Sequence, residues 1–191
     1  MNIFILNDDP VIAAQEQCDK HIPKMVVESA QMLSTTHRMI DGVETKVPSK
    51  SGKRMVKGYY LDDDREDILY KAVHFNHPCT VWTRESCCNY SWHYEHFVAL
   101  CDEYTYRYGK KHATDEKLRN VLSKLPNKIN RKGGMTPFKL AMKSNPECVV
   151  HGLGGTDAVA TYKNFYQTKQ HRFKMVWTKR PVPEWFKYAN I

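Results

Sequence analysis

The sequence lacks a long hydrophobic run and the motifs of the common enzyme classes. No apolar stretch approaches the roughly 20 residues that a membrane helix needs. The first residues, MNIFILNDDP, lack the basic start of a signal peptide. The HExxH and GxSxG motifs, the dinucleotide-binding fingerprint and the zinc-deaminase motif are all missing. We therefore expect a cytoplasmic protein that makes no contact with a membrane.

Cysteine is present but lacks the spacing of a disulfide framework, and there is no Cys-x-x-Cys. Four pairs have an i, i+3 spacing that zinc ligands also use: Cys18/His21, Cys148/His151, His74/His77 and His93/His96. Because this spacing often arises by chance in helices, the sequence favours free thiols packed as small apolar side chains. We expect no metal and no cofactor.

Charge is distributed unevenly along the chain. Residues 105–191 hold 18 Lys and Arg against 5 Asp and Glu, whereas residues 1–104 hold 11 against 16. A strongly basic half indicates a surface for a polyanion, of which nucleic acid is the commonest. The expected partner is double-stranded DNA, and we expect the protein to bind it as a monomer.

The hydrophobic spacing predicts a compact, mainly α-helical domain that covers residues 1–191. The predicted elements are a short N-terminal strand at Asn2–Leu6 and helices at Pro10–Gln17, Asp19–Met39, Pro78–Tyr108, Phe138–Met142 and from Thr156 or Asp157 to about His171. Gly109 marks a helix end, and the Gly152–Gly155 loop is interpreted as a turn because it lacks the Lys-Ser/Thr of a P-loop.

One segment, residues 44–67, differs in character and is interpreted as an insertion into this helical domain. Thr45–Val47 and Met55–Tyr60 flank the turn-rich Pro48-Ser49-Lys50-Ser51-Gly52, which predicts a β-hairpin. The acidic patch Asp62–Asp67 follows, and we expect it to form an exposed loop.

The predicted helix after Asp19 carries an unusually narrow polar stripe. On a helical projection its apolar residues form a broad face, and the residues left polar are His21, Lys24, Glu28, Gln31 and Thr35. A solvated helix usually has a wide, charge-rich face. A largely buried helix that keeps an imidazole, an ammonium and a carboxylate in line suggests a functional site. The alternative is an ordinary solvent edge, with a Lys24–Glu28 pair that contributes about 0.3–0.5 kcal/mol.

These residues resemble a known family. The short strand, Asp19-x-His21 and then Glu28 are similar to the N-terminal third of the phage pyrimidine-dimer DNA glycosylases of the endonuclease V type. Arg180-Pro181 and Trp185-Phe186-Lys187-Tyr188 are similar to that family's aromatic, basic C-terminus. The helical stretch from His77 to Arg107 is similar mainly in its pattern, so the resemblance covers roughly half of the chain. It places the protein in the host cytoplasm if a phage encodes it.

The resemblance implies a base-excision glycosylase and abasic-site lyase that acts on damaged or modified pyrimidines. In that family an N-terminal α-amine attacks the sugar C1′, and a glutamate at the position of Glu28 supports the sugar chemistry. The histidine matching His21 lies beside the DNA. Peptide α-amines titrate near pH 8, so a useful fraction is neutral and nucleophilic at about pH 7.5. A carboxylate can stabilise the cationic sugar and shuttle a proton.

The chain departs from the family at its second residue. The family's amine belongs to a small second residue that is exposed when the initiator methionine is removed. Asn2 is bulky enough to keep Met1 in place. The candidate catalytic residues are therefore Glu28, His21 and two alternative amines, the α-amine of Met1 and the side chain of Lys24.

The candidate DNA-binding residues combine cations, which meet phosphates, with aromatic rings, which stack on bases. They are Arg84, Arg107, Lys179, Arg180, Trp185, Lys187 and Tyr188. A tail fixed to the core by its aromatic side chains is an alternative interpretation that is compatible with binding. Two other functions stay open, a phage DNA base-modifying transferase and a non-catalytic DNA-binding protein.

Overall fold

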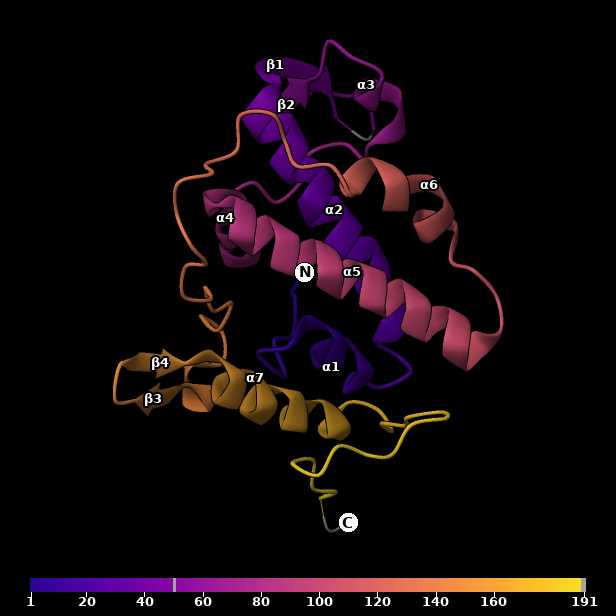
Figure 1. Ribbon diagram of the computed structural model, residues 1–191, viewed down its shortest axis with the longest axis vertical. Helices are drawn as coiled ribbons and strands as arrows, with labels where there is room; N and C mark the ends of the chain where they lie inside the picture. Colours follow the sequence, from indigo (N-terminus) through magenta and orange to yellow (C-terminus); the bar gives the residue numbers. More distant parts are fainter. Residues whose placement is uncertain (50, 190–191) are drawn as a thin grey trace.

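A long helix, α2, runs through the centre of the protein. In the computed structural model, which describes residues 1–49 and 51–189, α2 spans Ile22–Asp41 and packs against α4, α5 and α6 (Figure 1). Pro23 lies in its first turn, as predicted, where a missing N–H has no helical partner to lose. Most of its sides are buried, so even Ser29, Ser34 and Thr36 are shielded from solvent.

The other elements surround this helix. In chain order, the described elements are α1 (Pro10–Gln15), α2, β1 (Val43–Pro48), β2 (Met55–Tyr60), α3 (Arg65–Ile68), α4 (Pro78–Glu85), α5 (Cys87–Tyr108), α6 (Ala113–Leu122), the 3-10 helix Pro146–Cys148, β3 (Val150–Gly152), β4 (Gly155–Asp157), α7 (Ala158–Gln167) and the 3-10 helix Thr168–His171. The predicted mainly helical fold is confirmed. No helix in the described part of the chain is long and apolar enough to cross a membrane.

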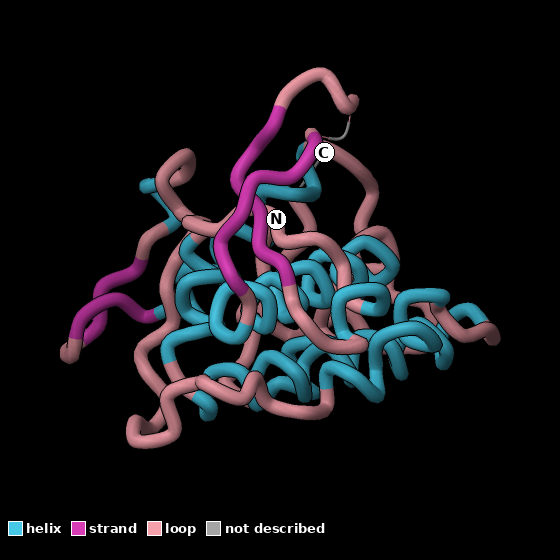
Figure 2. The backbone as a smooth tube through the Cα atoms, turned by 90° about the horizontal axis from the view of Figure 1, so that it is seen from above, coloured by secondary structure: helices cyan, strands magenta, loops and turns pink. Residues whose placement is uncertain are grey.

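Two small antiparallel hairpins are the only β-structure among the described residues. The predicted hairpin is confirmed: β1 pairs with β2 in the register Val43↔Tyr60, and the pair projects from the helical body (Figure 2). Lys50 in its turn lies outside the described residues. The Gly152–Gly155 loop joins β3 to β4, so the interpretation as a turn holds. Asp157 then caps α7 by accepting a hydrogen bond from the Ala160 amide.

The predicted helix from Pro78 to Tyr108 is divided at Ser86. Ser86 has an extended backbone (φ −150°, ψ 161°), which ends α4. Its hydroxyl accepts a hydrogen bond from the amide of Asn89, so Ser86 is the N-cap of a second helix, α5. The predicted end is confirmed, because Gly109 adopts the left-handed conformation (φ 69°) that closes the last turn.

The predicted strand at Asn2–Leu6 is wrong, although the segment is buried as its apolar residues require. Both sheets among the described residues are formed by other strands, so this segment has no ladder partner there. The predicted loop at Asp62–Asp67 is also wrong in part, since α3 begins inside it at Arg65. The helix α6 was not among the predictions.

The predicted helix at Phe138–Met142 is wrong as well. The amide of Thr136 donates to Asn89 Oδ1, and the carbonyl of Thr136 accepts from Trp82 Nε1. The ring of Phe138 packs on Trp82 and Trp92, at centroid distances of 4.8 and 5.0 Å. These contacts with α4 and α5 fix the segment as a loop and override its local cap-and-proline signal.

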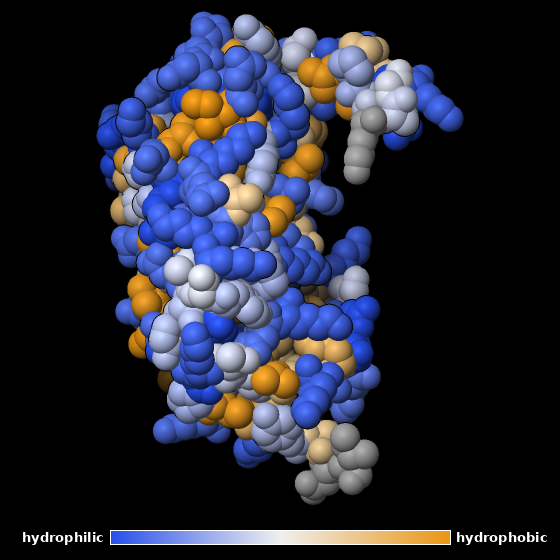
Figure 3. All heavy atoms as spheres, turned by 90° about the vertical axis from the view of Figure 1, so that its right-hand side faces the viewer, coloured by the Kyte–Doolittle hydropathy of each residue, from blue (hydrophilic) through white to orange (hydrophobic). Residues whose placement is uncertain are grey.

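The face seen in Figure 3 is mostly hydrophilic, with apolar side chains in small groups among the polar ones. In that view the outline is hollowed between the projecting hairpin at the top and the C-terminal segment at the bottom.

Candidate functional site

The α-amine of Met1 lies beside the carboxylate of Glu28. The amine nitrogen is 3.6 Å from Glu28 Oε2, and the backbone amide of Asn2 donates a hydrogen bond to the same oxygen at 2.9 Å. The Glu28 side chain is only 13% exposed, and the side chain of Met1 packs against the core at 4% exposure. Met1 and the first half of α2 thus form one fixed amine–carboxylate group.

Lys24 completes this group from the solvent side. Its ammonium is 3.5 Å from Glu28 Oε1, one helical turn away, and its side chain is 64% exposed. The structure therefore brings together three of the four predicted catalytic residues: Met1, Lys24 and Glu28. Both candidate amines contact the same carboxylate.

The side chain of Asn2 fixes the path of the N-terminal segment. Its Oδ1 accepts hydrogen bonds from the amides of Ile3 and Phe4, at 2.9 and 3.4 Å. Phe4 has a positive φ of 56°, a conformation that costs a bulky residue on the order of 1–3 kcal/mol. An aromatic cage compensates for this strain, since the Phe4 ring contacts Tyr162, Phe165 and Tyr166.

The structure places His21 inside this cage and not in a polar stripe with Glu28. Its ring stacks on Phe4 at a centroid distance of 4.8 Å, and its Nδ1 is hydrogen-bonded to the Tyr166 hydroxyl at 2.7 Å. Burial, reinforced by the charges of Lys169 and Lys24, lowers the pKa of His21 to about 4. In this structure His21 is neutral at pH 7 and supports Phe4, instead of lying at an exposed surface where the resemblance places it.

A different histidine, His77, lies close to the amine. It caps α4, where its Nδ1 accepts a hydrogen bond from the Cys79 amide at 3.3 Å. Burial lowers the pKa of His77, and the positive charges of the Met1 amine and of His74 lower it further, while the charge of Glu28 opposes them. In the sequence, His77 stands out only through its zinc-like spacing from His74 and as the start of the helical stretch to Arg107. Its position before Pro78 at a helix start is the local signal that could have drawn attention to it.

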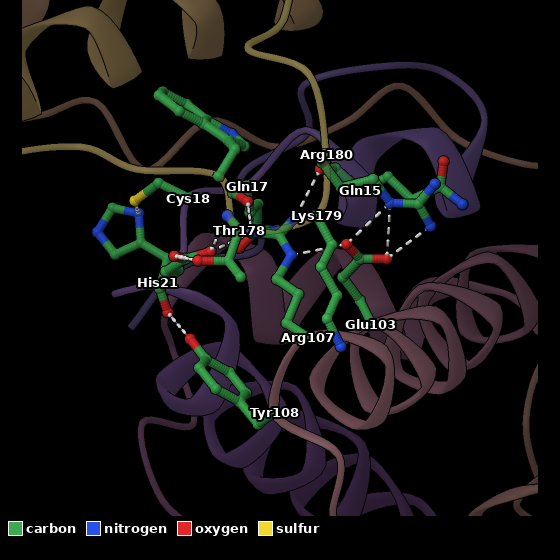
Figure 4. Close-up of polar contacts among 12 residues, drawn as sticks. Gln15, Gln17, Cys18, His21, Glu103, Arg107, Tyr108, Thr178, Lys179 and Arg180 are labelled. Carbon is green, nitrogen blue, oxygen red and sulfur yellow. Dashed lines mark hydrogen bonds and ion pairs between the residues drawn. The ribbon is translucent and has the colours of Figure 1, made fainter.

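Two of the predicted DNA-binding arginines are held by carboxylates inside the protein. Arg107 is fully buried and binds Glu103 at 2.7 Å and Asp19 at 2.9 Å, and it also donates to the carbonyls of Gln15 and Gln17 (Figure 4). Arg180 binds the same Glu103 through two nitrogens. The assignment of Arg107 to DNA is therefore wrong, because its guanidinium has no exposed surface.

Two further predicted cations contact backbone carbonyls. Arg84 donates to the carbonyl of Phe75 at 2.6 Å, and Lys179 donates to that of Tyr106 at 2.8 Å. Arg84 is half-buried, whereas Lys179 is exposed and keeps donors for a ligand.

The aromatic tail is divided between the core and the surface. Trp177 and Phe186 are buried, and Trp177 Nε1 donates to the carbonyl of Glu16. Trp185 is half-buried against Tyr166. Lys187 and Tyr188 are exposed and could reach a ligand. The alternative of a tail fixed by its aromatic side chains thus describes the first part of the segment.

The group around Met1 suits covalent chemistry at a carbonyl-like carbon. A neutral amine can attack such a carbon, and a carboxylate at 3.6 Å can stabilise the cation that forms and move a proton. No cluster of three or more His, Cys, Asp or Glu side chains suited to a metal ion occurs within residues 1–49 and 51–189.

Comparison with known proteins finds no relative of this chain. No protein-family model, curated protein or solved structure matches it.

Proposed function

We propose that this protein is a DNA-acting enzyme of the glycosylase and abasic-site lyase kind, with the α-amine of Met1 as nucleophile and Glu28 as the catalytic carboxylate. The observation that carries the proposal is the amine–Glu28 distance of 3.6 Å. In most folded proteins the terminal amine is at the surface and poorly ordered. Here a strained residue and an aromatic cage hold it against a half-buried carboxylate.

The proposed reaction needs no metal or redox partner. The neutral amine donates its lone pair to the sugar C1′, the bond from C1′ to the base breaks, and the base leaves with a proton. The sugar ring opens to give a protonated imine between the amine nitrogen and C1′. Loss of a C2′ proton then expels the 3′ phosphate. Glu28 stabilises the cationic sugar and imine, because its negative charge is in place before the charge develops.

The geometry also tolerates either form of the N-terminus. If Met1 is retained, its amine lies 3.6 Å from Glu28. If Met1 is removed, the nitrogen of Asn2 becomes the amine, and it already lies 2.9 Å from the same oxygen. The departure from the family at the second residue is therefore compatible with the proposed chemistry.

The support for DNA as the substrate is the charge of the C-terminal half and the exposed Lys179, Lys187 and Tyr188. These features suit a basic surface with an aromatic side chain that can stack on a base.

Borohydride trapping tests the proposal. The protein is incubated with duplex DNA that carries an abasic site, and borohydride reduces any imine to a stable adduct. We expect an adduct with the natural protein. Glu28→Gln should lower adduct formation and strand cleavage by on the order of a hundredfold while DNA affinity is kept. Glu116→Gln, the same change at an exposed position on α6, is the matched control.

The outcome separates the alternatives. Binding to the duplex without an adduct would favour a DNA-binding protein or a base-modifying transferase. Cleavage by Glu28→Gln at the natural rate would contradict the assignment of the carboxylate.

A further inference from the structure

The β1–β2 hairpin concentrates positive charge in the half of the chain that is otherwise acidic. Residues 43–60 hold five Lys and Arg against one Glu, whereas the rest of residues 1–104 holds six against fifteen Asp and Glu. This charge is separate from that of the C-terminal half. A cluster of cations on one projecting element is the electrostatic footprint of a surface that binds a polyanion.

The cations of the hairpin lie in solvent, and three of them have a charge to spare. Lys46, Lys53, Arg54 and Lys57 are all exposed. In the described part of the chain, the one ion pair of the hairpin joins Lys57 Nζ to Glu44 Oε2 at 2.6 Å. The charges of Lys46, Lys53 and Arg54 are therefore available to a ligand.

The strand register places two of the lysines directly opposite each other. Lys46 on β1 pairs with Lys57 on β2, so both side chains lie on the same face of the ribbon. Like charges in directly opposite positions destabilise a sheet, and the single carboxylate on this face, Glu44, is paired with Lys57. Lys46 is therefore unfavourable for the hairpin alone and becomes favourable when an anion lies over this face.

The tip of the hairpin adds hydroxyl groups to the cations. Ser49, Ser51, Lys53 and Arg54 line one shallow hollow there. The turn is closed by the amide of Ser49, which donates to the carbonyl of Arg54 at 2.8 Å. Hydroxyl, ammonium and guanidinium groups are the side-chain donors that proteins use for the phosphates of DNA.

The base of the hairpin is firmly attached to the end of α2. Arg38 on α2 donates to the carbonyl of Tyr59 at 3.3 Å. A Cβ atom at Gly42 would lie 2.5 Å from the Arg38 carbonyl oxygen and 2.6 Å from that of Tyr60, so only glycine lets the ribbon approach the helix this closely. The orientation of the ribbon is therefore fixed relative to the helix that carries Glu28.

We propose that the β1–β2 hairpin enters the major groove of duplex DNA, where Lys46, Lys53 and Arg54 contact phosphates. Paired strands lie about 4.8 Å apart, and the major groove, about 12 Å wide, admits such a ribbon with its side chains, whereas the minor groove, about 6 Å wide, does not. The sheet has two strands, with no third strand beside them in the described residues to block entry.

The position of the hairpin suits a contact on the same duplex as the amine–Glu28 group, so this inference rests on the proposed function for its partner. Along α2, Gly42 is about 20 Å from Glu28, less than the roughly 34 Å of one turn of B-DNA. In Figure 3 the hairpin and the C-terminal segment, which carries the exposed Lys187 and Tyr188, bound the same hollow.

The first test measures binding to duplex DNA as a function of salt. Lys46→Gln, Lys53→Gln and Arg54→Gln are combined in one variant. Between about 50 and 200 mM salt, the slope of log affinity against log salt should fall by about two to three, because about three phosphate contacts are lost. The thermal midpoint should stay equal or rise, since the repulsion between Lys46 and Lys57 is removed. An unchanged slope would overturn the proposal.

Lys71→Gln is the matched control for Lys46→Gln alone. Lys71 is also an exposed lysine of the acidic half, but its ammonium is 2.5 Å from Glu66. We expect Lys46→Gln to lower the slope by about one and Lys71→Gln to leave it unchanged. Equal losses in the two variants would show a general effect of net charge and would contradict a specific contact by the hairpin.

The second test locates the groove. Dimethyl sulfate methylates guanine N7, which lies in the major groove. On a duplex with an abasic site and guanines on both sides of it, the natural protein should protect guanines within one turn of that site, and the combined variant should not. Guanines that stay fully reactive under saturating protein would contradict entry into the major groove.

Borohydride trapping with the natural protein separates this inference from the proposed function. If an adduct forms but the combined variant keeps the full salt slope, the hairpin proposal is wrong and the proposed function stands. If no adduct forms but the slope falls and the guanines are protected, the hairpin proposal stands and the proposed function is wrong. Failure of the natural protein to bind the duplex would contradict both.

Discussion

The Glu103 carboxylate receives a two-point contact from Arg180, with Nε at 3.0 Å and Nη2 at 2.9 Å. The same carboxylate binds the buried Arg107, which is four residues further along α5 and also bonded to Asp19 (Figure 4). Glu103 thus joins α5 to the C-terminal segment, and Arg107 joins α5 to the segment between α1 and α2. Charges that the sequence suggested for DNA instead hold the N-terminal and C-terminal segments together.

Replacing Glu103 by Gln should destabilise the fold. The change leaves the fully buried Arg107 with less negative charge around it, and we expect a loss of about 3 kcal/mol in the free energy of unfolding. Urea denaturation measures it. Asp102→Asn is the control, because Asp102 is 64% exposed and bound to Arg119, so its loss should be below about 0.5 kcal/mol. Equal losses in the two variants would contradict the role assigned to Glu103.

Stability should fall as the pH is lowered from about 6.5 to 4. Burial lowers the pKa of His21, His37 and His96 to about 4. The unfolded chain takes up protons near pH 6.5, whereas the folded protein resists them until about pH 4. What these buried, neutral histidines add to the free energy of unfolding is therefore complete above pH 6.5. Acidification removes it, by up to about 3 kcal/mol for each histidine. Urea midpoints at several pH values measure the slope. A flat profile from pH 7 to 4.5 would contradict these burial-induced shifts.

Two neighbouring aromatic residues in the tail should behave differently. Phe186 is 6% exposed, so Phe186→Ala should cost about 3 kcal/mol of stability. Tyr188 is 59% exposed, so Tyr188→Ala should leave the thermal midpoint unchanged and weaken DNA binding by about 1–3 kcal/mol if its ring stacks on a base. Fluorescence anisotropy with duplex DNA measures the second effect. Normal binding by Tyr188→Ala would show that this ring does not contact the DNA.

The two candidate amines can be distinguished by blocking each one. An added N-terminal residue displaces the α-amine from Glu28 and should abolish the borohydride adduct. Lys24→Ala keeps that amine and should still form the adduct. Mass spectrometry of the reduced, digested adduct locates the modified nitrogen. An adduct on Lys24 would move the nucleophile to the helix.

Local signals in the sequence were sufficient for the elements that short-range chemistry determines. Pro23 in a first turn, Gly109 at a helix end and the turn residues before Met55 each act within a few residues of their element. The cap-and-proline pattern at Thr136-Pro137 predicted a helix that does not form. Trp82 and Asn89, more than 40 positions away, bind that segment instead.

The candidate site was only partly predictable for a similar reason. Lys24 and Glu28 are one turn apart on a helix, so their pairing follows from spacing. The charges of Arg107 and Arg180 are visible in the sequence, but their shared partner is not, because Arg180 lies 77 positions from Glu103. The charges of Met1 and Glu28 act on His77 only because the fold brings these residues near it.

The cage around Phe4 has a consequence for the timing of synthesis. Its walls are Tyr162, Phe165 and Tyr166, and the Tyr166 hydroxyl also accepts a hydrogen bond from the amide of Cys18. Phe4 is therefore enclosed by residues that the ribosome adds about 160 positions after it. A nascent chain that ends before α7 lacks these aromatic side chains, so Phe4 has no cage to hold it. The position of the N-terminal segment beside Glu28 is therefore fixed only after α7 has been made.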